Sequence, residues 1–205
     1  MKNKIIILFF IFSVNISLFA ESLNIKSSSI SIDKNTKLTI LKDNIIVTDE
    51  KKNEFKTNYA EYNKEVELLT SQGKTTVLTS EGYFLTGTDI IFDNKNQFIK
   101  SNYPVVINDL AKNKIFMENF EYSTKNNFFR STGNIQLKDT KNNSYNFSQI
   151  YIDEKKREIL GTDVKAFLND QNFKLNKKNN PRVFANTVKI DDQIRDFTKS
   201  VFTLC

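Results

Sequence analysis

The feature that most constrains this chain is an internal repeat of 30 residues. One apolar column at this spacing consists of Ile32, Tyr62, Phe92, Tyr122 and Ile152. Two positions before its members stand Ile30, Ala60, Ile90, Phe120 and Ile150. Directly after them come the turn formers Asp33, Asn63, Asp93, Ser123 and Asp153. A fixed period of this length predicts stacked copies of one supersecondary unit, because a single unit cannot bury its apolar face alone.

Three further columns keep the same spacing. A second column consists of Leu38, Leu68, Phe98 and Phe128, and it breaks at Glu158, where the neighbouring Ile159 is a substitute. A third is Val47, Val77, Ile107, Leu137 and Phe167, and a fourth is Phe55, Leu85, Ile115 and Tyr145. We expect no insertion within this register, and a degenerate sixth copy beyond a loop at 176–181, where Val188 and Ile190 follow.

Within each copy the apolar residues alternate with polar ones. Ile135 and Leu137 flank Gln136, for example, and the runs between turns are rich in Ile, Val, Phe, Tyr and Thr. Period-two alternation predicts strands and therefore an all-β fold, wound as a β-solenoid or folded as two facing sheets. The only helix candidate after residue 20 is the weak one at 193–200.

The apolar columns predict either a closed dry core or an open trough between the sheets. The chain has 18 Phe and 7 Tyr, so the lining is bulky and aromatic. For the trough, the candidate lipid-binding residues are Ile32, Tyr62, Phe92, Tyr122, Ile152, Val47, Val77, Ile107, Leu137, Phe167, Phe98 and Phe128.

The first twenty residues have the pattern of a secretory signal peptide. Lys2 and Lys4 precede an apolar run that is shorter than the ~20 residues a membrane-spanning helix needs, and Ala20 offers a cleavage site. We expect residues 1–20 to be the signal and 21–205 to form one domain, with an uncleaved anchor as the alternative. Cys205, the only cysteine, is either an incidental thiol or half of an intermolecular bridge.

The sequence lacks residues that several classes of function require. The chain has no histidine and only 5 glycines, which argues against histidine-dependent catalysis, a metal site, a phosphate-binding loop or a cofactor. Asp33, Asp93 and Asp153 share one repeat position, so a role in turns is expected for them rather than catalysis. Nucleic acid is not an expected partner, because no basic cluster interleaves with aromatic residues. We therefore expect a protein that is not an enzyme.

Three short motifs resemble a known family. They are Ser71-Gln72-Gly73-Lys74, Ala60-Glu61-Tyr62-Asn63-Lys64 and Thr132-Gly133-Asn134-Ile135-Gln136-Leu137. Together with the export signal they resemble the OstA-like domain of the lipopolysaccharide transport proteins LptA and LptC and the N-terminal part of LptD. The stretch from 185 to 205 looks most like LptD, but no outer-membrane barrel follows it here, so either a truncated LptD or a standalone LptA-like protein is expected.

The resemblance implies a β-jellyroll of two antiparallel sheets in the periplasm. It implies that the acyl chains of lipopolysaccharide lie between the sheets and that the lipid moves toward the outer membrane. It also implies edge-to-edge pairing with other Lpt proteins or head-to-tail oligomers, and we expect the free edges at 28–32 and at 188–191 or a nearby strand. The alternatives are a structural β-solenoid of the cell surface and a membrane-anchored LptC-like component.

Overall fold

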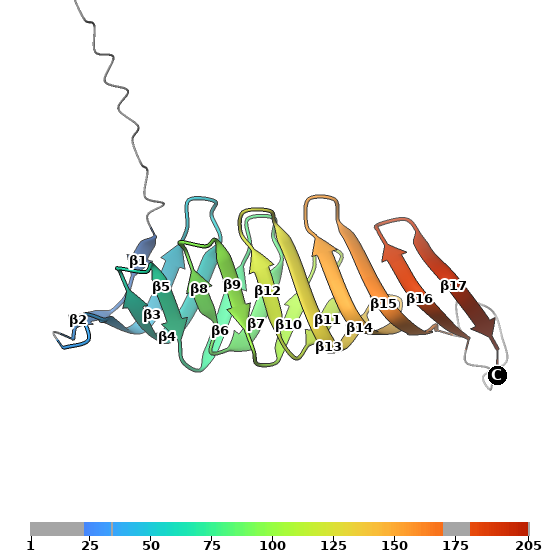
Figure 1. Ribbon diagram of the computed structural model, residues 1–205, viewed down its shortest axis with the longest axis horizontal. Coiled ribbons are helices and arrows are strands. Elements are labelled where there is room, and N and C mark those ends of the chain that lie inside the picture. The colour runs from blue at the N-terminus through green and yellow to red at the C-terminus, as the bar shows by residue number, and fades with distance from the viewer. Residues whose placement is uncertain (1–22, 34, 170–180, 205) are drawn as a thin grey trace, which may run out of the picture.

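The computed structural model describes residues 23–33, 35–169 and 181–204. These residues form strands joined by turns, and every strand pairing among them is antiparallel (Figure 1). The signal segment, the greater part of the loop at 176–181 and Cys205 lie outside the described residues. The strands are β1 (Asn24–Lys26), β2 (Ser29–Ile32), β3 (Thr39–Thr48), β4 (Glu54–Asn63), β5 (Leu68–Ser71), β6 (Lys74–Leu78), β7 (Phe84–Thr88), β8 (Ile91–Asp93), β9 (Phe98–Ser101), β10 (Val105–Asn108), β11 (Lys114–Met117), β12 (Phe120–Ser123), β13 (Phe128–Lys138), β14 (Ser144–Asp153), β15 (Glu158–Phe167), β16 (Arg182–Ile190) and β17 (Arg195–Thr203).

Two sheets arise because the long strands bend at a corner and give one half to each sheet. The first sheet runs β2, β3, β4, β5, β8, β9, β12 and then β13 to β17. The second runs β1, β3, β4, β6, β7, β10, β11 and then β13 to β17. The expected β-jellyroll of two facing antiparallel sheets is confirmed, and antiparallel hairpins take the place of solenoid coils.

The backbone itself repeats every 30 residues. The turns of the first sheet each carry a residue with positive φ at one position: Lys37, Glu67, Gln97, Asn127 and Arg157, all between 53° and 59°. At the corner, Gly73 and Gly133 have φ of 79° and 106°, a conformation that glycine adopts without steric cost. The glycines of two of the family-like motifs therefore lie where a strand passes from one sheet to the other.

The predicted turn residues cap their turns. The side chains of Asp33, Asp93 and Asp153 accept hydrogen bonds from the backbone amides of Asn35, Asn96 and Lys156. Hydrogen bonds from backbone amides hold the pKa of Asp33 and of Asp191 below the ordinary value of an aspartate. The turn role expected for the repeated aspartates is confirmed.

The second predicted column lies one position away from the buried one. Tyr62 pairs with Leu69 across its hairpin, and residues that pair across a hairpin share a face of the sheet. The buried column is therefore Leu69, Ile99, Phe129 and Ile159, while Phe98 and Phe128 point outward. Ile159 belongs to this column in its own right and is not a substitute for Glu158.

The register also shifts once, at the corner of β15. In β13 four positions separate the buried Ser131 from the buried Ile135, but in β15 only three separate Gly161 from Val164. The corner has one residue fewer, so Ala166 takes the inward place predicted for Phe167, which is exposed. The helix candidate at 193–200 is wrong as well, because these residues belong to β17 and the turn before it.

Candidate functional site

Two rows of inward side chains run the length of the array, one on each sheet. The row of the first sheet pairs successively through Ile32, Thr39, Tyr62, Leu69, Phe92, Ile99, Tyr122, Phe129, Ile152, Ile159, Ile190 and Arg195. The row of the second sheet pairs through Ile25, Val47, Phe55, Val77, Leu85, Ile107, Ile115, Leu137, Tyr145, Ala166, Val183 and Phe202. Apart from Thr39 and Arg195 of the first sheet, the members of the two rows are aliphatic or aromatic, and together they form the interior between the sheets.

The two rows meet between the sheets. The rings of Phe55 and Phe92, which come from opposite sheets, lie 6.4 Å apart between centroids. Phe129 stacks on Tyr122 at 4.2 Å and reaches Tyr83 of the second sheet's turns at 6.2 Å. The middle of the interior is therefore filled by the protein's own aromatic side chains.

The structure brings most of the predicted site residues into these rows. Seven of them are at most 1% exposed: Phe92, Tyr122, Ile152, Val47, Val77, Ile107 and Leu137. Tyr62 and Ile32 also belong to the first-sheet row, Tyr62 being partly buried. Phe98, Phe128 and Phe167 lie on outer faces. Whether any of the twelve contacts a lipid stays a prediction.

The interior is uncovered at the two ends of the array. Ile30 and Ile32 on β2 are 57% and 70% exposed, although their side chains continue the inward face of the first sheet. At the other end, Phe202 on β17 is 52% exposed in the second-sheet row. Figure 1 shows these strands at opposite ends of the array. Apolar inward-facing surface is thus available to a partner or ligand at the β2 end.

Along the side opposite the corner, the turns of the two sheets face each other and form what we call the mouth. Glu154, in a turn of the first sheet, accepts a 2.7 Å hydrogen bond from the Thr79 hydroxyl in a turn of the second. Its other oxygen accepts a 2.7 Å hydrogen bond from the Tyr122 hydroxyl. Glu154 is only 2% exposed, and burial raises its pKa to about 7. Burial likewise raises the pKa of Tyr122.

Other contacts also close the mouth near Glu154. The side-chain amide of Asn127 donates to Ser80 Oγ and to Glu81 Oε1, each at 3.2 Å. The Lys51 ammonium donates to the backbone carbonyl of Thr124 at 2.8 Å. Both contacts join a turn of the second sheet to a turn of the first, so polar groups tie the sheets together over the packed interior.

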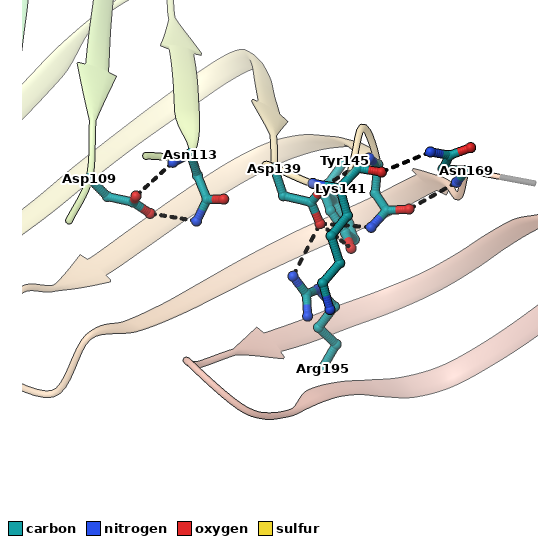
Figure 2. Close-up of polar contacts among 8 residues, drawn as sticks. Asp109, Asn113, Asp139, Lys141, Tyr145, Asn169 and Arg195 are labelled. Atoms are coloured by element: carbon teal, nitrogen blue, oxygen red, sulfur yellow. Dashed lines mark hydrogen bonds and ion pairs between the residues drawn. The ribbon is translucent and has the colours of Figure 1, made fainter. Parts of the chain in front are cut away.

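A second tie lies nearer the C-terminal end (Figure 2). Arg195 of β17 donates from Nη2 to Asp139 Oδ2 at 3.1 Å, across the mouth. Its guanidinium lies over the ring of Tyr145, 5.9 Å from the centroid. The Asp139 side chain is 2% exposed and is held further by the amide groups of Asn143. The last strand is therefore anchored to the second sheet by a nearly buried ion pair.

The aspartate of this tie belongs to a repeated turn motif. Asp49 and Asn53, Asp109 and Asn113, and Asp139 and Asn143 each make the same pair of hydrogen bonds, from backbone and side-chain amides to the carboxylate. The Asp-x-x-x-Asn spacing is visible in the sequence, although it was not among the predicted features. No comparable spacing in the sequence marks the residues that contact Glu154 and Arg195.

Among the described residues, no group of three or more His, Cys, Asp or Glu is arranged to hold a metal ion. Nor does any helix in this part of the chain have the length and apolar character to cross a membrane.

The fold and the site define a two-sheet β-jellyroll of 30-residue repeats, with an apolar interior uncovered at its ends and a polar mouth along one side. No family model and no curated protein matches the chain. Among solved structures it is similar to LptH of Pseudomonas aeruginosa, described as the LptA homologous periplasmic component of the conserved lipopolysaccharide transport device. The identity is 12%, the match covers 65% of this chain and 77% of that chain, and the TM-score is 0.27. We draw no functional argument from this likeness.

Proposed function

We propose that this protein is a periplasmic lipopolysaccharide-binding module that carries the lipid toward the outer membrane, with its acyl chains between the two sheets. The observation that carries the proposal is the pair of apolar inward rows, which run from one uncovered end to the other. The OstA-like motifs support it, because their glycines form the corner that joins the sheets. An LptA-like protein and an LptD N-terminal domain both fit this role.

Burial in such an interior would strongly stabilise bound acyl chains. Each buried methylene contributes ~0.8 kcal/mol, so a chain of about twelve carbons leaves it slowly for water. A carrier therefore needs apolar surface without a gap, and the second-sheet row, which is aliphatic or aromatic throughout, supplies it. The sugars and phosphates of the lipid remain in water at the mouth, where polar side chains face each other.

Loading requires the mouth to open. The centre of the interior is filled, and Glu154 and Arg195 tie the sheets across the mouth. We propose that acyl chains enter at the β2 end, where Ile30 and Ile32 are exposed, and advance as these ties break in turn. The sheets then part along the mouth and stay joined at the corner.

The ends also suggest how such modules join. Among the strands of the described residues, β2 pairs with β3 alone and β17 with β16 alone, so these two strands lie at the ends of the array. The edge expected at 28–32 corresponds to β2. For the other edge, expected at 188–191 or a nearby strand, β16 is inside the array, because Val188 pairs with both β15 and β17, and the terminal strand is the neighbouring β17. Because β2 and β17 differ, we propose a head-to-tail contact with another Lpt protein or another copy.

A second candidate function is a structural spacer of the cell surface. The packed centre favours it, because a dry core needs no ligand. An LptC-like component that keeps its N-terminal segment as an anchor is distinguished by sequencing the N-terminus of the exported protein. A start at Glu21 excludes that anchor.

Binding of purified lipopolysaccharide to variants tests the proposed function. We expect Ile32→Asp at the exposed end and Phe92→Asp in the centre to weaken binding, with Asn126→Asp in a turn as the control. Circular dichroism must show that each variant is folded, because a buried unpaired carboxylate is destabilising. Ile32 is already exposed, so its variant remains informative if Phe92→Asp unfolds. Equal binding by folded Ile32→Asp and by the control would overturn the proposal.

A further inference from the structure

The outer face of the second sheet carries two rows of side chains that point away from the interior. One row pairs through Lys26, Ile46, Lys56, Thr76, Thr86, Val106, Phe116, Gln136, Asn146, Lys165, Phe184 and Val201. The other pairs through Asn24, Thr48, Glu54, Leu78, Phe84, Asn108, Lys114, Lys138, Ser144, Phe167, Arg182 and Thr203. Glu54 is the only acidic residue in these rows. We call this surface the basic face.

The outer face of the first sheet has the opposite balance. Its outward strand residues include the carboxylates of Glu61, Asp93, Glu121, Asp153, Glu158 and Asp196, against Lys42, Lys100, Arg130 and Lys189. Two of these cations are neutralised on the sheet itself, because Arg130 pairs with Glu121 and Lys189 with Glu158, both at 2.7 Å. The two faces of one molecule therefore differ in the sign of their charge.

On the basic face Lys56 has an acidic partner, Glu54, and it is the only cation of this face with one among the described residues. Lys114, Lys138 and Lys165 form no ion pair with the described residues. Lys138 lies over the ring of Phe116, 5.8 Å from its centroid, and Arg182 lies 5.7 Å from that of Phe167. The cations thus stand beside aromatic rings and keep their charge available to an external anion.

Apolar side chains are interleaved with these cations, and Leu78, Phe84 and Phe116 are exposed while Val106 is half-buried. Leu78 pairs with Phe84, and Val106 pairs with Phe116, so they form a band across four consecutive strands. Beside this band, Pro104, Val106, Phe116 and Gln136 line a shallow depression, whose lining also includes one carboxylate, that of Glu118. The face is extended, and its cations do not converge on one point, as a site for a single phosphate would require.

We propose that the basic face docks the protein on the surface of an anionic phospholipid bilayer. An extended surface that alternates Lys with Phe fits the interface of such a membrane, where phosphates attract the cations and aromatic side chains lie at headgroup level. The charge difference between the faces orients the molecule, with the first sheet turned to water. This docking does not depend on binding of lipid inside the protein.

An environment-sensitive fluorophore tests which face meets the membrane. It is attached to a cysteine at Phe116→Cys on the basic face or, as the matched control, at Leu160→Cys on the outer face of the first sheet, both in a Cys205→Ser background. The two positions are 37% and 43% exposed. Vesicles contain phosphatidylcholine with or without phosphatidylglycerol, and the full chain is used throughout. Because each label reports only its own position, attachment by the N-terminal segment does not imitate the result.

We expect the emission at position 116 to shift to the blue with phosphatidylglycerol vesicles, to return in high salt, and not to shift at position 160. In the double variant Lys114→Gln and Lys138→Gln, roughly ten times more lipid should be needed to produce the same shift, because each cation near the surface adds attraction. Lys42→Gln with Lys100→Gln is the control pair and should leave it unchanged. An equal shift at both positions, no shift at 116, or equal loss in both pairs would overturn the proposal.

Discussion

The Thr79 hydroxyl donates a 2.7 Å hydrogen bond to Oε1 of Glu154, and this contact joins a turn of the second sheet to a turn of the first. The two residues are 75 positions apart in the chain. The same carboxyl accepts from Tyr122, a member of the first-sheet inward row. The interior and the mouth are therefore connected through one buried ionisable group, and its protonation affects how firmly the sheets are held.

Replacing Glu154 by glutamine should remove a pH dependence of folding stability. Burial raises the pKa of Glu154 from 4.5 to about 7 in the folded protein, and Glu81 and Asp153 add to the rise. The stabilising contribution is therefore complete below about pH 4.5 and is lost as pH rises through 7. We expect wild type to lose about 2 to 3 kcal/mol relative to Glu154→Gln between pH 5 and 8.

Urea denaturation of both proteins at several pH values measures this difference. Tyr62→Phe is a suitable control, because the Tyr62 hydroxyl makes no hydrogen bond with the described residues. Stability curves of wild type and Glu154→Gln that run parallel from pH 5 to 8 would show that Glu154 is not the titrating group.

The second apolar column, whose buried members lie one position after the predicted ones, gives a second prediction. Phe129→Ala should cost about 3 to 5 kcal/mol, because it leaves a cavity between the sheets. Phe128→Ala should cost about 1 kcal/mol or less, since Phe128 lies on the outer face and loses mainly its stacking on Tyr151 at 5.8 Å. Chemical denaturation of both variants measures the two costs, and a larger cost for Phe128→Ala than for Phe129→Ala would favour the register predicted from sequence.

Much of the fold could be predicted from the repeat alone. The fixed spacing of Phe92 and Tyr122 shows that they share a face, and alternation around Gln136 shows that the face belongs to a strand. The hairpin register was missed, because it depends on how many residues the turn between Tyr62 and Leu69 takes up. The shorter corner in β15 was missed too, although Lys165 at an expected inward position was a sign of it.

The candidate site was predicted only in part, and the reason is related. Spacing identifies which residues share a face, but it does not give the angle at which two sheets pack. The contacts of Glu154 with Thr79 and of Arg195 with Asp139 depend on that angle. Burial of a turn residue such as Glu154 therefore had no counterpart in the repeat pattern.

The free edges give a prediction about assembly. Purified protein should form linear oligomers that grow with concentration, and Ile32→Lys should reduce them, because a charge then opposes burial of the exposed β2 end. The Ile32 side chain is already 70% exposed, so the fold should be retained. Analytical ultracentrifugation measures the oligomers, with Val66→Lys in an exposed turn as control. A strict monomer at high concentration, with no binding to Lpt-type domains, would remove edge pairing from the mechanism.

The central claim is that acyl chains lie between the sheets, and photo-crosslinking tests it most directly. Para-azidophenylalanine replaces Phe92 or Phe202 in the inward rows, and Phe98 or Phe128 on the outer face of the first sheet as matched aromatic controls. The purified variants are irradiated with lipopolysaccharide in the absence of bilayers, and lipid adducts are counted by mass spectrometry. The account predicts adducts at positions 92 and 202 and few at 98 and 128. Adducts of equal yield at all four positions, or none at 92 and 202, would contradict it.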